Sequence, residues 1–98
     1  MEIIKEQNGQ ELKIALEGKL DTTSAPQLDS ELSSSLEGIT ELILDFEKLK
    51  YISSAGLRVI LSAQKTMNKQ GSMKLINVNE MIEEIFDMTG FLDILTIE

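Results

Sequence analysis

The sequence predicts a single α/β domain with a mixed β-sheet of four to five strands and helices packed on it. An Asn8-Gly9 pair between two strand-like segments is a strong signal for a hairpin of antiparallel strands. The segment 41–46 has three consecutive apolar residues, as expected for a central strand that helices cover on both faces. Helical and strand-like patterns then alternate, which favours parallel pairing with right-handed crossovers. The predicted order is β-β-α-β-α-β-α-β.

The first half of the chain predicts two strands and a helix. The strands span 2–7 and 11–17, and in the second of them apolar residues alternate with polar ones. Ser24 is placed to cap the following helix, with Gln27 three residues later completing a capping box. Four apolar residues then repeat with helical spacing, namely Ala25, Leu28, Leu32 and Leu36. Gly38 marks the end of this helix.

The second half continues from the strand at 41–46 through a turn into a helix that ends near Lys69. Three shorter elements complete the chain: a strand at 73–78, a helix capped by Asn79 and broken at Thr89-Gly90, and a last strand at 94–97. A length of 98 residues fits one domain spanning 1–98, and no segment has the composition of a linker.

Composition excludes several classes of function. The chain has no cysteine and no histidine, so disulfides, thiol chemistry and serine–histidine hydrolysis lack their usual residues. The net charge is −8 without a basic cluster, which argues against direct binding of nucleic acid. No apolar run approaches the roughly 20 residues of a membrane span, and the N-terminus does not resemble a signal peptide. We therefore expect a cytoplasmic protein with no membrane insertion, no metal and no cofactor.

The turn at 53–56 is the most informative stretch for function. Two adjacent hydroxyls, Ser53 and Ser54, and a glycine, Gly56, lie between a strand and an amphipathic helix. Unpaired N–H groups and the positive end of the helix dipole make such a turn a natural site for an anion or a phosphoryl group. The alternative is that both serines simply cap the helix.

Three blocks of the sequence resemble the STAS domain of bacterial anti-sigma factor antagonists. They are Gly18-Lys19-Leu20-Asp21, the run from Leu42 to Phe46 with 51–61, and Ile85 to Phe91. The blocks occur in family order, and the resemblance covers essentially the whole chain. It implies a STAS fold and a non-enzymatic role in a partner switch. The unphosphorylated antagonist binds an anti-sigma factor that is also a serine kinase, a sigma factor is released, phosphorylation ends the binding, and a serine phosphatase resets the cycle.

The resemblance also implies which residues act. The family's acceptor serine lies two residues before the glycine, which is Ser54 here. The family aspartate before it is replaced by Ser53, so Ser53 is an alternative acceptor. The residues expected to bind the partner are Asp21, Ser53, Ser54, Ala55, Gly56 and Arg58. Among them, Gly56 is expected to keep the turn open for a close approach of the partner's backbone.

Other interpretations remain open. The domain could be a STAS accessory subunit of a larger assembly, such as a lipid-transport complex, without phosphorylation. A small enzyme with Ser54 as nucleophile would need Lys65 or Lys69 as its base. Asp21 could instead cap the nearby helix, and Arg58 could be an ordinary exposed arginine.

Two groups of residues near the C-terminal half also have alternative interpretations. Glu80, Glu83 and Glu84 are expected to form a solvated helix face rather than a metal site. The methionines at 67, 73, 81 and 88 are expected to lie mostly in the core, although a deformable binding surface is the alternative.

Overall fold

A four-stranded mixed sheet forms one layer of the molecule, and the computed structural model describes all residues from 1 to 98. The elements are β1 (Glu2–Asn8), β2 (Glu11–Leu20), α1 (Ala25–Ser35), β3 (Glu41–Ile52), α2 (Ser54–Gln70), β4 (Ser72–Ile76), α3 (Glu80–Met88) and a short 3₁₀ helix η1 (Phe91–Asp93). This order confirms the prediction. The last predicted strand is reduced to a single parallel bridge between Ile97 and Leu75.

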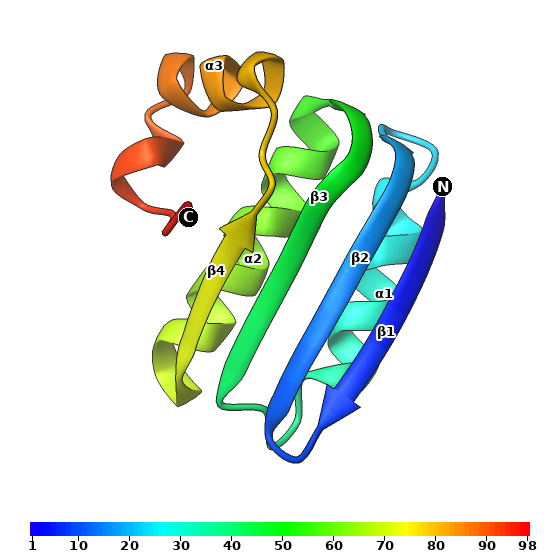
Figure 1. The fold of residues 1–98 in the computed structure, drawn as a ribbon, viewed down its shortest axis with the longest axis vertical. Helices are drawn as coiled ribbons and strands as arrows, with labels where there is room; N and C mark the ends of the chain where they lie inside the picture. The colour runs from blue at the N-terminus through cyan, green and yellow to red at the C-terminus, as the bar shows by residue number, and fades with distance from the viewer.

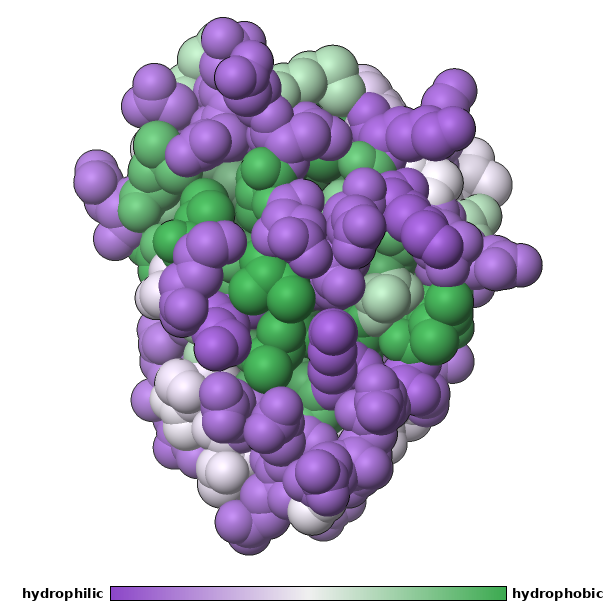
Figure 2. Space-filling model, viewed as in Figure 1, coloured by the Kyte–Doolittle hydropathy of each residue, from purple (hydrophilic) through white to green (hydrophobic).

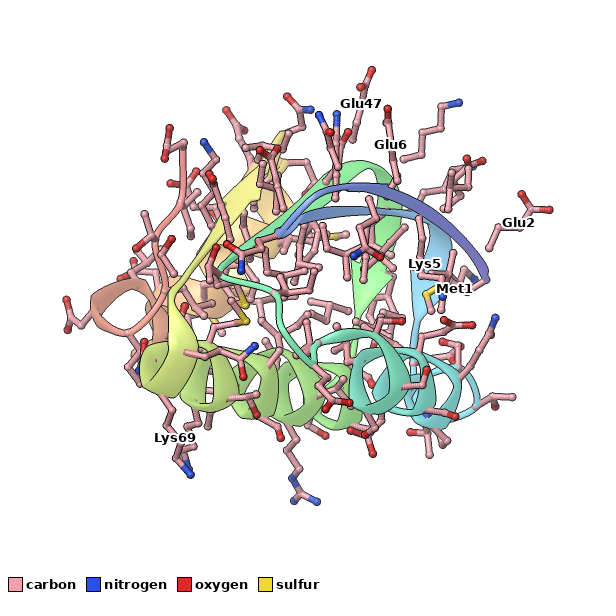
Figure 3. All side chains as sticks on the ribbon, turned by 90° about the horizontal axis from the view of Figure 1, so that it is seen from below. Met1, Glu2, Lys5, Glu6, Glu47 and Lys69 are labelled. Atoms are coloured by element: carbon pink, nitrogen blue, oxygen red, sulfur yellow. The ribbon has the colours of Figure 1, made fainter.

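The strands lie in the order β1-β2-β3-β4, with β1 antiparallel to β2 and the other pairs parallel. Because β2, β3 and β4 are neighbours in chain order, right-handed crossovers place α1 and α2 on the same face of the sheet. Figures 1 and 3 show both helices on that face, while the opposite face is open. The expectation that helices cover both faces of β3 is therefore wrong. Leu42 and Leu44 are buried beneath the helices, whereas Ile43 lies half-buried on the open face.

The core contains 24 buried apolar residues, most of which lie between the sheet and the helices α1 and α2. A second, smaller contact attaches α3 to this core. Ile82 and Phe86 of α3 are fully buried, and the Phe86 ring lies 6.3 Å from the ring of Phe46 on β3. None of the helices has the length and apolar content needed to cross a membrane.

The first hairpin differs in detail from its prediction. Asn8 pairs with Glu11, so the two turn residues are Gly9 and Gln10 rather than Asn8 and Gly9. Gly9 has φ +65°, and neither Asn8 nor Gln10 has a positive φ. A positive φ at the first turn residue alone is typical of a type II′ turn, in which glycine occupies that position.

The connection from β4 to α3 fixes where α3 lies. Asn77 turns the chain with φ +57° and donates a hydrogen bond from Nδ2 to Oδ1 of Asp45 on β3 (2.9 Å). Asn79 then caps α3 as predicted, because its Oδ1 accepts the Ile82 N–H (2.9 Å). The Nδ2 of Asn79 also donates to the Leu49 carbonyl of β3 (3.1 Å). Two asparagines thus tie the segment that leads into α3 to β3, one at Asp45 and the other at Leu49.

Gly71, between α2 and β4, gives a test of this packing. A Cβ added there would overlap the backbone of Thr40, whose carbonyl oxygen and carbon are the nearest atoms. Because a backbone contact cannot move aside cheaply, we expect Gly71→Ala to lower the free energy of unfolding by about 1–3 kcal/mol or more. Urea denaturation followed by circular dichroism measures this change.

Gly38→Ala is the matched control. Gly38 has φ +79° but no atom within 4 Å of the added Cβ, so only the conformational cost of about 1–2 kcal/mol applies. If Gly71→Ala were no less stable than the parent, the close approach of the Gly71 backbone to Thr40 would be incorrect.

Candidate functional site

The candidate site lies where β2 and β3 end side by side. β3 has 12 residues against the ten of β2, and two register shifts absorb the difference, so that Leu20 pairs with Ile52. The Ser53 N–H then donates to the Leu20 carbonyl (2.9 Å). The loop that begins at Asp21 and the turn that begins at Ser53 therefore leave the same edge of the sheet, as expected from the sequence.

The two serines of the turn have different surroundings. Ser53 is the N-cap of α2, half-buried and in an extended conformation, and its Oγ accepts the Gly56 N–H (3.3 Å). Ser54 is the first residue of the helix and is exposed, and its hydroxyl makes no hydrogen bond within the chain. Capping therefore accounts for Ser53 and leaves the Ser54 hydroxyl free at the positive end of α2.

Gly56 is needed for packing inside the protein, whereas the sequence predicts that it leaves room for the backbone of a partner. It is buried, and a Cβ at this position would lie 2.7 Å from Cγ and 3.0 Å from the carbonyl oxygen of Leu20. Only a glycine therefore lets the first turn of α2 pack this closely on the end of β2. Gly56 positions Ser54 but does not itself present a surface.

Asp21 organises the loop between β2 and α1. Its Oδ1 accepts the N–H groups of Thr23 (3.0 Å) and Ser24 (3.1 Å). The hydrogen bond from the Ser24 N–H is the main cause that lowers the pKa of Asp21, and the Thr23 N–H adds to it. Asp21 thus closes the turn that precedes α1 rather than capping the helix itself, because it bonds no N–H of residues 25–35. Its side chain stays half-exposed at the sheet edge.

The prediction that Ser24 caps α1 is wrong. The Ser24 side chain forms no cap hydrogen bond, and its φ and ψ angles are helical. Its hydroxyl instead donates to the Lys19 carbonyl (2.7 Å) and accepts the Asp21 N–H (2.9 Å). Ser24 therefore closes the loop on the end of β2, and α1 begins without a side-chain cap.

The remaining predicted residues extend along the first turn of α2. Ala55 is half-buried and packs against the core, while Arg58 is exposed and takes part in none of the three ion pairs of the chain. Arg58 lies four residues after Ser54, so both side chains are on the same side of the helix. Tyr51, which is not among the residues predicted from the sequence, is 43% exposed two residues before Ser53. The signal in the sequence that could have identified Tyr51 is an aromatic residue just before a polar turn.

The structure contradicts the arrangement that a serine enzyme would need. α2 runs without interruption from Ser54 to Gln70. At a rise of 1.5 Å per residue, Lys65 lies about 16 Å and Lys69 about 22 Å along the helix axis from Ser54. A general base must come within hydrogen-bond reach of its nucleophile, so neither lysine can serve Ser54.

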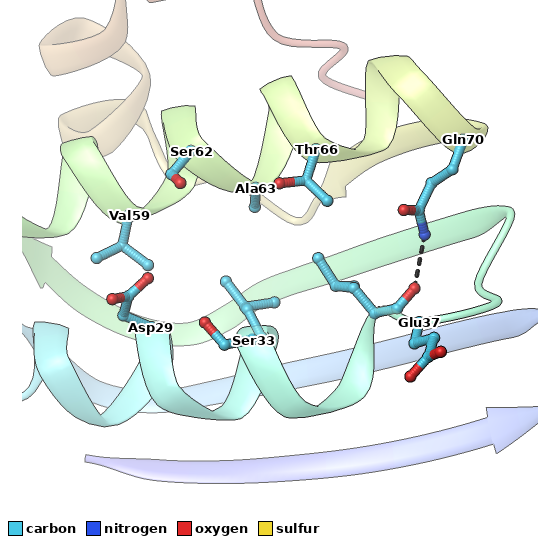
Figure 4. Close-up of a pocket in the computed structure, with 10 residues that line it drawn as sticks. Asp29, Ser33, Glu37, Val59, Ser62, Ala63, Thr66 and Gln70 are labelled. Atoms are coloured by element: carbon cyan, nitrogen blue, oxygen red, sulfur yellow. Dashed lines mark hydrogen bonds between the residues drawn. The ribbon is translucent and has the colours of Figure 1, made fainter.

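A groove of about 300 Å³ between α1 and α2 is separate from this site (Figure 4). Its polar lining consists of carboxylates, hydroxyls and an amide: Asp29, Ser33, Glu37, Ser62, Thr66 and Gln70. Gln70 donates from Nε2 to the Leu36 and Ile39 carbonyls (2.6 and 2.7 Å), which fastens the ends of the two helices together. Ser54 does not line the groove, so we do not assign it to the candidate site.

The different roles of Ser53 and Ser54 predict different changes in the free energy of unfolding when each is replaced by alanine. Ser53→Ala removes the cap of α2 and is expected to lower the free energy of unfolding by about 1 kcal/mol. Ser54→Ala removes no hydrogen bond within the chain and should change stability by less than about 0.5 kcal/mol. Thermal or urea unfolding of both variants decides this, and equal losses would contradict the assignment of the cap to Ser53 alone.

The lowered pKa of Asp21 predicts a pH-dependent contribution to stability. A carboxyl whose pKa is lower in the folded state stabilises the fold above its unfolded pKa, and the contribution is lost as the pH falls through the folded value. Asp21→Asn keeps an acceptor oxygen and removes the charge. The variant should therefore be less stable than the parent at pH 7, and urea titrations at decreasing pH should show this difference shrinking in acid. A difference that stays constant with pH would exclude a role for the charge.

Comparisons with known proteins identify the family. The model of the STAS domain matches residues 2–98. BtrV of Bordetella bronchiseptica is 38% identical over 81 residues, which cover 81% of this chain and 70% of BtrV. The anti-sigma-B factor antagonist of Bacillus subtilis is 35% identical over 92 residues, which cover 93% of this chain and 84% of the relative.

Solved structures share the fold. An anti-sigma factor antagonist from Mycobacterium paratuberculosis has a TM-score of 0.88 at 14% identity, over 98% of this chain and 83% of that one. Unphosphorylated SpoIIAA has a TM-score of 0.79 at 20% identity, over 99% of this chain and 87% of that one. The match to the family model spans nearly the whole sequence, and the relatives align along most of their own length. The chain therefore belongs to the STAS domain family.

Proposed function

We propose that this chain is an anti-sigma factor antagonist that works as a phosphorylation-controlled partner switch. In its unphosphorylated form it binds an anti-sigma factor that is also a serine kinase, and a sigma factor is released. Phosphorylation of Ser54 ends the binding, and a serine phosphatase restores it. A relative with 35% identity over most of both chains, named as an anti-sigma-B factor antagonist, supports this role. The role is regulatory binding rather than catalysis.

The observation that carries the proposal is the free hydroxyl of Ser54. The residue is exposed and unbonded at the first position of α2, while its neighbour Ser53 already caps the helix. A kinase can therefore reach Ser54 without disturbing the hydrogen bonds of the turn. Ser53 remains the alternative acceptor, but its modification would cost the cap.

A phosphate on Ser54 should be tolerated by the domain itself. A phosphoserine carries about −1.5 to −2 charges near neutral pH, and the start of a helix favours negative charge by about 0.3–1 kcal/mol at an exposed position. The phosphate then acts mainly on binding, because its bulk and charge would lie within the packed contact with the partner and weaken it. A tenfold loss of affinity needs only about 1.4 kcal/mol. SpoIIAA, which shares this fold, has been solved in an unphosphorylated and a phosphorylated form.

The proposed partner surface is the sheet edge around Ser54. Asp21 and Ser53 lie there because β2 and β3 end together, and Ala55 and Arg58 continue it along α2. Arg58 has no ion pair within the chain, so its charge is available to a partner or to a phosphate on Ser54. Gly56 contributes by holding this turn against Leu20.

A pair of substitutions at Ser54 tests the switch. Ser54→Ala keeps the surface uncharged and should bind the anti-sigma factor kinase about as tightly as the parent. Ser54→Asp adds a charge and should raise the Kd about tenfold or more, with both variants folded. Isothermal titration calorimetry measures the affinities, and circular dichroism controls for the fold. Tight binding by Ser54→Asp would contradict the electrostatic mechanism.

The acceptor itself is identified by incubation with the kinase and ATP, followed by mass spectrometry of the parent, Ser53→Ala and Ser54→Ala. We expect one phosphate on the parent and on Ser53→Ala, and none on Ser54→Ala. A phosphate that disappears only in Ser53→Ala would move the acceptor by one residue. A parent that binds the kinase but stays unmodified would exclude the phosphorylation switch. Co-purification with the subunits of a membrane complex instead of the kinase would favour the alternative of a STAS accessory subunit.

A further inference from the structure

Exposed apolar side chains are concentrated at the C-terminal end of the fold. Six large apolar residues of the whole chain are exposed, and four of them lie within residues 81–94: Met81 (47%), Met88 (82%), Leu92 (37%) and Ile94 (49%). Of the four methionines considered above, Met67 and Met73 lie in the core, whereas Met81 and Met88 are exposed. The expectation that most of the four are core residues is therefore wrong. Figure 2 shows green, hydrophobic side chains on the surface at the α3–η1 corner. Apolar groups gathered in this way mark an interaction site more often than scattered ones do.

Helix α3 has two apolar faces. Ile82 and Phe86 point into the core, and Ile85 is half-buried against it. Met81, Ile85 and Met88 repeat at intervals of four and three residues, and the two methionines are exposed. That spacing places the three side chains in one row on the helix surface, beside the buried face. We call this row the methionine stripe. The unbranched, polarisable side chains of methionine adapt well to the surface of another protein.

The other side of α3 is acidic. Glu80, Glu83, Glu84 and Asp87 are all exposed, and none of them forms an ion pair within the chain. With Leu92 they line a shallow hollow of about 280 Å³. A lysine or arginine can pack its aliphatic stem on a leucine and place its charged end among carboxylates. The hollow beside the methionine stripe therefore complements a basic side chain.

Helix α3 lies at the same end of the molecule as the Ser54 turn. Asn79 anchors its first turn to the Leu49 carbonyl, three residues before the end of β3. Figures 1 and 4 both show α3 beside the N-terminal end of α2. A partner that covers Ser54 can therefore extend onto α3 without crossing the sheet.

We propose that the methionine stripe and its acidic flank form a second docking surface, which binds a basic, amphipathic segment of the anti-sigma factor. The proposal rests on the function proposed above. A second copy of this chain is a poorer occupant, because two molecules of net charge −8 would bring their carboxylates together. An anionic membrane is disfavoured for the same reason. The stripe supplies apolar contact, and the four carboxylates select a partner of opposite charge.

The test compares the affinity of the anti-sigma factor kinase for four chains by calorimetry. The double substitution Met81→Ser with Met88→Ser should raise the Kd about tenfold or more, because two apolar contacts are lost. Ile4→Ser is the matched control, since Ile4 is 49% exposed on β1 and belongs to neither surface. It should bind within about twofold of the parent. Ser54→Asp, measured alongside, reports on the switch independently.

A second arm removes charge without changing shape, through Glu83→Gln, Glu84→Gln and Asp87→Asn together. This variant should bind more weakly at low ionic strength, and its Kd should depend less steeply on salt than that of the parent. Circular dichroism verifies that each variant is folded, as expected for exposed positions.

The outcomes separate the two proposals. If the methionine variant binds like the parent while Ser54→Asp binds weakly, the α3 surface is wrong and the switch at Ser54 stands. If the parent does not bind the kinase, both fail. A parent that sediments as a dimer, with a monomeric methionine variant, would assign the stripe to a second copy and overturn the proposal.

Discussion

The hydrogen bond from the Ser53 N–H to the Leu20 carbonyl fixes the geometry on which the rest of the site depends. It joins the residue that follows β3 to the last residue of β2, and Gly56 then brings the first turn of α2 against the same leucine. A shift of one residue in this pairing would exchange the buried and exposed sides of the strand ends. The same contact therefore determines how the first turn of α2 packs on β2 and where Ser54 lies on the surface. The turn needs Gly56 for the close packing and serine hydroxyls for the cap and the exposed site.

Neighbouring polar residues at this edge of the sheet have different hydrogen-bonding roles. Ser53 and Ser24 use their hydroxyls inside the protein, the first on a helix N–H and the second on a strand carbonyl. Asp21 uses its carboxylate to hold its own loop. The Ser54 hydroxyl, at the first position of α2, has no hydrogen-bond partner within the chain. A modification of the Ser54 hydroxyl can therefore change the charge and shape of the surface while the hydrogen bonds beneath it stay intact.

The sequence was sufficient to predict the order of elements, because hairpin, capping and periodicity signals are local. Asn79 is an example, since its cap depends only on the residues that follow it. Ser24 was misassigned because a local capping pattern cannot show that the Lys19 carbonyl competes for its hydroxyl. Ile43 was expected beneath a helix, but the face that the helices cover follows from strand order and crossover handedness rather than from apolar character. Met81 and Met88 are chemically identical to the core methionines Met67 and Met73, so residue type alone does not distinguish them. They are exposed because α3 packs on the core through Ile82 and Phe86.

The bridge at Ile97 has a consequence for self-assembly. A sheet can recruit further chains only through strands whose backbone groups are unpaired. On β4, both the N–H and the carbonyl of Leu75 are already engaged by the C-terminal residues Thr96 and Glu98. Only β1 remains uncovered along its whole length, and it carries charged residues at positions 2, 5 and 6. The C-terminal residues therefore obstruct edge-to-edge growth at the centre of β4, and an incoming strand finds a full-length unpaired edge only on β1.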